Sequence, residues 1–88
     1  MKITKLIILM KNGDRYELNS NKDFDRRKNL TVKEISGLIS RNIANGTQTL
    51  IVKEGYDIKY VSRFEVYNVD ELIMIADDIS SLQLLEGF

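Results

Sequence analysis

The chain has 88 residues, a mass of 10.2 kDa and a formal net charge of zero, and it contains no cysteine, histidine, proline or tryptophan. This length allows one small domain, spanning residues 1–88, and the lack of cysteine excludes disulfides and thiolate metal sites. The lack of histidine removes the usual general base and the commonest metal ligand, so we expect no catalytic residue, no metal site and no cofactor.

A β-hairpin is the first predicted element. A run of β-forming residues from Ile3 to Met10 precedes Asn12-Gly13, after which an alternating apolar pattern resumes. Asn-Gly is the strongest short hairpin signal, because a type I′ turn requires a positive φ at both central residues. With these two residues at the centre of the turn, one face of the hairpin should belong to the core, and it consists of Ile7, Leu9, Tyr16 and Leu18. The opposite face, with Ile8 and Met10, is then half covered or used for contact.

A helix is predicted over residues 32–44, after a polar connection over residues 19–29 in which Phe24 is the one anchor. Thr31 and Glu34 have the spacing of a capping box, and Asn45-Gly46 supplies a stop signal. One helical face is apolar, and its residues are Val32, Ile35, Leu38, Ile39 and Ile43. Gly37 lies inside this helix at a cost of about 1 kcal/mol, and either a close approach of the helix to a sheet or chance would explain it.

The second half of the chain is predicted to be mostly strand. Residues 47–53 form a strand, Glu54-Gly55 a turn, and residues 57–68 contain another strand. The run 72–76 fits either a buried strand or part of one long C-terminal helix, and we favour the strand, followed by an irregular or helical tail. The predicted fold is therefore α+β, with an N-terminal hairpin, one central helix on a small, mostly antiparallel sheet, and two or three further strands, while the C-terminal tail is left open as strand or helix.

Charge is distributed unevenly along the chain. Residues 1–46 carry ten bases and five acids, residues 47–88 carry three bases and eight acids, and no base follows Arg63. Either the two halves pair in the fold and cancel, or the surface is polarised and orients a partner. The apolar run over residues 6–10 is too short for a secretory signal or a membrane span, so we expect a soluble, cytoplasmic protein without membrane contact.

Three candidate chemical motifs lack residues that their chemistry needs. Residues 21–25 open like a calcium loop, but Arg26 replaces the glycine of the sixth position and Val32 the glutamate of the twelfth. The carboxylate pairs Asp70-Glu71 and Asp77-Asp78 do not converge by themselves, because neighbouring residues of a strand point to opposite faces. No serine lies in a G-x-S-x-G elbow, and no glycine-rich phosphate loop is present. We therefore do not expect an enzyme.

Apolar residues outside the predicted core indicate a protein-binding surface instead. Contiguous exposed apolar surface usually marks a contact site, including contacts between copies of the same chain. The candidates lie on the second face of the hairpin and in the apolar, acidic tail, and they are Ile8, Met10, Ile79, Leu82, Leu84, Leu85 and Phe88. The leading hypothesis is a non-enzymatic binding module with a protein partner, and self-association into a homo-oligomer is a second option.

Nucleic-acid binding is the alternative hypothesis. A basic triplet precedes the predicted helix, and bases alternate with aromatic residues further along the chain, a combination that can hold phosphates and stack bases. The candidate residues are Arg26, Arg27, Lys28, Lys53, Lys59, Tyr60 and Arg63. The same aromatic residues would also suit a core with phenolic hydroxyls at its rim.

Three segments carry a resemblance to known proteins. They are Leu-Met-Lys-Asn-Gly-Asp-x-Tyr at 9–16, Gly-Thr-x-x-Leu-Ile-Val at 46–52, and the apolar segment 66–75. They resemble small proteins of unknown function from phages and mobile elements of low-GC Gram-positive bacteria. The resemblance implies an α+β fold, a location in a bacterial host cell and a role as a modulator or inhibitor of a host factor, including a defence factor. It brings no catalytic residue with it.

Overall fold

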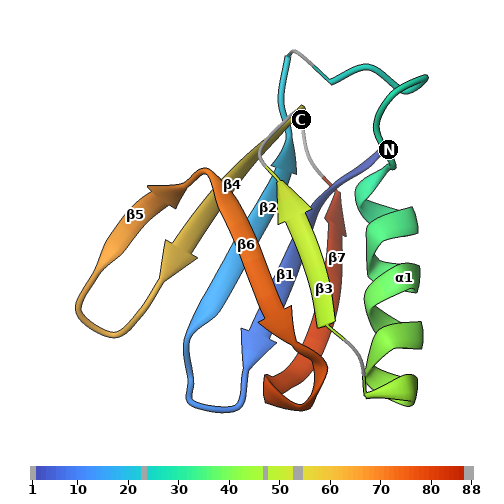
Figure 1. Cartoon of the computed structure of the whole chain (residues 1–88). Coiled ribbons are helices and arrows are strands. Elements are labelled where there is room, and N and C mark those ends of the chain that lie inside the picture. Colours follow the sequence, from blue (N-terminus) through green and yellow to red (C-terminus); the bar gives the residue numbers. More distant parts are fainter. Residues whose placement is uncertain (1, 23, 47, 53–54, 87–88) are drawn as a thin grey trace.

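The computed structural model describes residues 2–22, 24–46, 48–52 and 55–86 (Figure 1). In chain order these residues form β1 (Ile3–Met10), β2 (Arg15–Ser20), α1 (Val32–Asn45), β3 (Gln48–Val52), β4 (Tyr56–Val61), β5 (Val66–Val69), β6 (Glu71–Ile75), the 3-10 turn η1 (Ala76–Asp78) and β7 (Ile79–Glu86). One layer is an antiparallel five-stranded sheet in the order β5-β4-β2-β1-β7. The second layer holds α1 and the two-stranded sheet β3-β6. The predicted α+β fold is confirmed.

The N-terminal hairpin is present, but its turn contains three residues instead of two. The Met10 N–H donates to the Asp14 carbonyl (2.7 Å), and the Gly13 N–H donates to the Met10 carbonyl (3.0 Å). Gly13 has a φ of +94°, whereas the φ of Asn12 is negative. A type I′ turn would need a positive φ at both residues, while a three-residue loop needs it only at the final glycine. The observed φ values are therefore those of the longer loop.

This turn shifts the register of the hairpin by one residue from the predicted one. Leu6 pairs with Leu18, and Ile8 pairs with Tyr16. A one-residue shift exchanges the two faces of a strand. Leu6 and Ile8 are consequently fully buried in the core, whereas the predicted core residue Leu9 is exposed on the other face.

Helix α1 begins at the predicted residue and ends at Asn45, one residue beyond the predicted end. The Thr31 hydroxyl accepts a hydrogen bond from the Glu34 N–H (3.2 Å), and the Glu34 carboxylate accepts one from the Thr31 N–H (3.2 Å), which completes the capping box. Gly46 ends the helix with a φ of 70°. The buried face is narrower than predicted. It holds Val32, Ile35 and Ile39, while Leu38 and Ile43 are exposed at its margin.

The core lies between the two layers. α1 packs on β1 and β7, and β6 contributes two buried side chains on the same side of the five-stranded sheet. The buried cluster consists of Leu6, Ile8, Leu18, Val32, Ile35, Ile39, Tyr56, Ile58, Leu72, Met74 and Ile79. The Tyr56 hydroxyl donates to the Leu30 carbonyl, and the ring of Phe24 packs edge-on against Tyr56 at 5.7 Å between centroids. Phe24 thus anchors the connection before the helix, as predicted.

The C-terminal part of the chain contains more strand than the sequence analysis predicted. Strand β6 confirms the strand favoured over residues 72–76, but residues 57–68 contribute to two strands, β4 and β5. The prediction of an irregular or helical tail is wrong, because residues 79–86 form β7 and pair with β1. The hairpin is followed by five further strands in the described residues, not two or three.

Substitution of two glycines by alanine should change the stability in opposite directions. Gly55 has a φ of +83°, and a Cβ there would collide with the side chain of Asn29, whereas Gly37 lies in α1 with no neighbouring atom within 4 Å of an added Cβ. The open space at Gly37 excludes a close helix-on-sheet approach as the explanation for this glycine. We expect Gly55→Ala to lower the free energy of unfolding by more than about 1 kcal/mol, since alanine resists the left-handed region. We expect Gly37→Ala to raise it by about 0.5–1 kcal/mol. Urea denaturation measures both, and equal shifts of the two variants would contradict the described conformations.

Candidate interaction surface

The apolar residues predicted to contact a partner lie mostly in the core or against it. The one-residue register shift turns Ile8 inward, where its side chain is 0% exposed. Formation of β7 does the same for the tail, because Ile79 is buried, and Leu82 and Leu84 pair with the buried residues of β1 and face the core. Three predicted contact residues pack against the buried cluster, namely Met10, Leu82 and Leu84. Leu85 is half-buried, and Phe88 lies outside the described residues.

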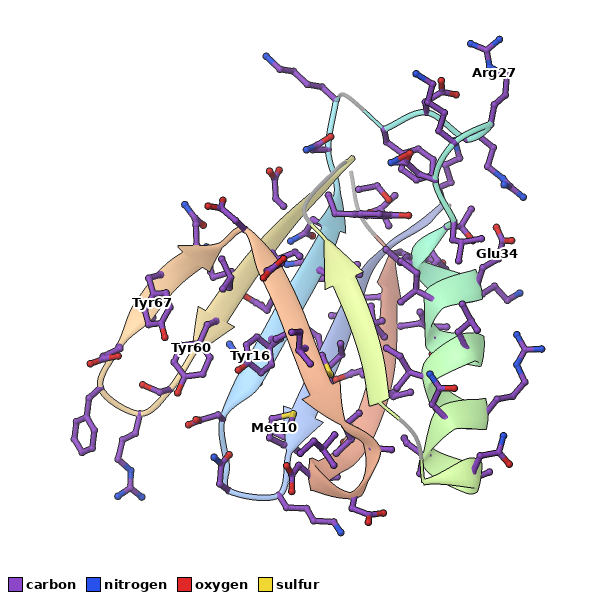
Figure 2. All side chains as sticks on the ribbon, viewed as in Figure 1. Met10, Tyr16, Arg27, Glu34, Tyr60 and Tyr67 are labelled. Atoms are coloured by element: carbon purple, nitrogen blue, oxygen red, sulfur yellow. The ribbon has the colours of Figure 1, made fainter. Side chains whose placement is uncertain are left out.

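The basic triplet of the nucleic-acid hypothesis lies far from Tyr60, the aromatic candidate of that hypothesis. It is in the loop before α1, where Arg26 pairs with Glu34 (3.1 Å) and Arg27 with Asp25 (3.4 Å). Figure 2 shows Arg27 at the opposite end of the molecule from Tyr60 and Tyr67. The predicted basic and aromatic candidates are therefore not brought together into one site.

The remaining bases of that hypothesis are also separated from one another. Lys59 and Tyr60 are neighbours on β4, so their side chains point to opposite faces of the sheet. Arg63 lies in the turn between β4 and β5, and Lys53 lies outside the described residues. Arg63 is thus the one predicted base that the described structure keeps near the aromatic face.

A row of three tyrosines crosses β2, β4 and β5 on the face that carries the core (Figure 2). Tyr16 and Tyr60 have ring centroids 5.2 Å apart, and those of Tyr60 and Tyr67 are 4.9 Å apart, with tilted planes in both pairs. Such offset aromatic pairs add roughly 0.5–1.5 kcal/mol beyond the area that they bury. Exposure increases along the row, because Tyr16 packs against the core whereas Tyr67 is 50% exposed.

The middle tyrosine of the row joins the β1–β2 turn to β4. The Tyr60 hydroxyl donates a hydrogen bond to Asp14 Oδ2 at 2.5 Å. This bond to a carboxylate favours the neutral phenol, and together with burial it raises the pKa of Tyr60 to about 12. Asp14 is itself fixed, since its N–H donates to Asn12 Oδ1 at 2.9 Å. Burial also raises the pKa of Tyr16.

An open hollow of about 430 Å³ lies between the β1–β2 turn and the β4–β5 turn. Its lining residues are Asn12, Gly13, Asp14, Ser62, Arg63 and Phe64. The Ser62 hydroxyl accepts hydrogen bonds from the Phe64 and Glu65 N–H groups (3.2 and 2.9 Å), which fixes the β4–β5 turn. Phe64 projects from this turn with 88% of its surface exposed.

Strand β6 carries apolar side chains on both faces. Leu72 and Met74 are buried in the core, whereas Ile73 and Ile75, on the opposite face, are 61% and 51% exposed. A strand that is apolar on both faces is typical of strands that are covered on both sides. We call Ile73 and Ile75 together the β6 outer face. The sequence shows the dense apolar run but not which of its residues are exposed, because that depends on the tertiary packing.

The described residues show no arrangement for metal binding or membrane crossing. Nowhere in them do three Asp, Glu, His or Cys side chains gather as metal ligands would. No helix among them is long and apolar enough to cross a bilayer.

The chain matches no protein-family model, no curated protein and no solved structure. The function is therefore inferred from the exposed residues of the structure alone.

The hydrogen bond between Tyr60 and Asp14 predicts a pH dependence. Because the pKa of Tyr60 is raised in the folded protein, its contribution to stability is complete below the ordinary value of 10.0 and is lost as the pH rises toward about 12. In Asp14→Asn the pKa of Tyr60 should fall toward 10.0, as followed by tyrosinate absorbance. The absorbance change near pH 12 belongs to Tyr60 if it disappears in Tyr60→Phe, and Tyr67→Phe is the control in which it should persist. If the ionisation near pH 12 is unchanged in Asp14→Asn, the hydrogen bond to Asp14 is not its cause.

Proposed function

We propose that the chain is a non-enzymatic binding module that contacts a protein partner through the β6 outer face. The observation that carries this proposal is the exposure of Ile73 and Ile75 on a strand whose other face lies in the core. Burying a fully exposed isoleucine side chain gains roughly 1.5–3 kcal/mol. Covering two side chains that are about half exposed would therefore contribute about as much as one whole isoleucine.

The available chemistry supports binding rather than catalysis. The sequence has no histidine or cysteine, so a general base would have to be a carboxylate, lysine or tyrosine. Tyr60 has the most strongly shifted pKa among the described groups, and the shift is upward, to about 12. A group with this pKa stays protonated near neutral pH and does not act as a base there.

The resemblance to small phage proteins supports a more specific role. A small binding module from a phage or mobile element would act in the cytoplasm of the bacterial host. We propose that it modulates or inhibits a host factor there, including a defence factor. Two of the three segments that carry the resemblance, 9–16 and 66–75, lie in the N-terminal hairpin and across β5 and β6.

Nucleic-acid binding is the second candidate, and the tyrosine row with Arg63 nearby favours it. Aromatic rings on a sheet can stack unpaired bases. Here, however, the three rings pack on one another, which leaves chiefly Tyr67 with a free ring face. Arg26 and Arg27 are already paired with acids. These contacts make the protein-binding proposal the stronger one.

Salt dependence separates the two candidates. We expect no saturable binding of single-stranded nucleic acid, or binding whose logarithm changes little with the logarithm of salt concentration. A slope steeper than about −2, which corresponds to roughly three phosphate contacts, would favour nucleic-acid binding. Fluorescence anisotropy with labelled DNA and RNA oligonucleotides measures this slope.

The β6 outer face can be tested by paired substitutions. Ile73→Lys with Ile75→Lys should weaken binding of a partner captured from a bacterial lysate at least tenfold, because the face becomes charged. The matched control is Leu9→Lys with Leu38→Lys, which changes two exposed apolar residues elsewhere. Calorimetry with the purified partner measures the affinities. Equal affinity of the two double variants, or no specific partner for the wild-type chain, would contradict the proposed function.

A further inference from the structure

We propose that the partner contributes an extended segment, flanked by lysine or arginine, which adds to the free edge of β6 as a third strand of the small sheet. This inference rests on the proposed function and specifies the mode of binding and the chemistry of the bound segment. Three features of the described residues support it, and they are the unpaired edge of β6, the uncovered end of the tyrosine row and the acidic surroundings of β6.

The first feature is the edge itself. In residues 2–22, 24–46, 48–52 and 55–86, β6 pairs with β3 alone. Its other edge faces the side of the molecule on which Tyr60 and Tyr67 lie (Figures 1 and 2). An edge strand presents a row of N–H and C=O groups that another chain can use for pairing. Addition of an extended peptide to such an edge is a common mode of recognition, in which the main chain supplies affinity.

The second feature is that the second layer stops short of the end of the five-stranded sheet. α1 packs on β1 and β7, and β6 follows beyond β3, but β4 and β5 extend past β6 (Figure 1). The tyrosine row shows the consequence, since Tyr16 packs against the core while Tyr67 is half exposed. A strand added to β6 would lie over this end of the row. Its inward side chains would pack on Tyr67, and its outward ones would extend the β6 outer face.

The third feature is charge. Glu71 opens β6, and Asp77 and Asp78 follow its end in η1, and all three are exposed. No base follows Arg63 in the sequence. The ion pairs of Lys5, Arg15, Arg26 and Arg27 join these bases to acids of the same, basic half of the chain. The Lys11 N–H donates to the Asp78 carbonyl (2.9 Å), so one base lies beside the two acids at that end. Both ends of the β6 edge still keep an excess of negative charge, which favours a segment with basic flanks.

A second copy of this chain fits the edge less well. Two β6 strands paired antiparallel about Ile73 would place Glu71 of one copy at the same end as Asp77 and Asp78 of the other. Glu71 would face Ile75 of the other copy, with the two aspartates just beyond it, and like charges gathered at one end repel one another. The same repulsion would occur at both ends because of the two-fold symmetry. The charges thus favour a different, basic partner.

The test uses the full chain and a synthetic peptide of alternating valine and threonine with two lysines at each end. Calorimetry should show binding at least threefold tighter than that of the same peptide with glutamate in place of lysine. Amide hydrogen exchange should slow in β6 and not in β5 or β7. A peptide with N-methylated backbone amides should not bind, because it lacks the donors for strand pairing.

Charge variants of the protein provide the matched comparison. Glu71→Gln with Asp77→Asn should abolish the preference for the lysine peptide, whereas Asp57→Asn, an exposed acid on β4, should leave it unchanged. Slower exchange in β5 or β7 instead of β6 would overturn the proposal, as would concentration-dependent protection of β6 without peptide. If the lysine peptide fails to bind while partner binding still depends on Ile73 and Ile75, strand addition is wrong and the proposed function stands. If partner binding does not depend on these two residues, the proposed function itself is wrong.

Discussion

The register of β1 against its two neighbours is the constraint on which the rest of the structure depends. β1 lies between β2 and β7, so its pairing decides which side chains of three strands face the core. The three-residue turn that ends in Gly13 sets this register. With it, Leu6 and Ile8 lie beneath the second layer, and Tyr16 begins the row that crosses the sheet. A two-residue turn would have exchanged the faces of β1 relative to β2.

The same register determines which apolar residues are left for contact. Because Ile8 and the inward residues of β7 complete the core, the predicted contact residues of the hairpin and the tail offer little apolar surface to a partner. The second layer holds one helix and two strands, and it leaves β6 with an exposed outer face and Tyr67 half exposed. The proposed contact surface is thus a consequence of an α+β fold whose smaller layer does not extend over the whole sheet.

Local signals in the sequence predicted the elements whose formation depends on local chemistry. The capping box of Thr31 and Glu34 and the stop at Gly46 fixed the bounds of α1, and Asn12-Gly13 marked the hairpin. The register was not predictable, because both loop lengths accept this dipeptide and the packing of distant strands selects between them. β7 was missed for a related reason. The alternation of Leu82 and Leu84 with polar residues becomes informative only once β1 is known to be its neighbour.

The candidate surface depended still more on tertiary structure. The sequence marked residues 72–76 as an apolar strand, but the exposure of Ile73 and the free edge of β6 follow from the order of strands in two sheets. Site-specific photo-cross-linking in bacterial cells tests the central claim most directly, with a photoreactive residue at position 73 and, for comparison, at position 9. The account predicts a protein adduct from position 73 that is absent from position 9. Adducts of equal yield from both positions, or cross-links from position 73 to nucleic acid alone, would contradict it.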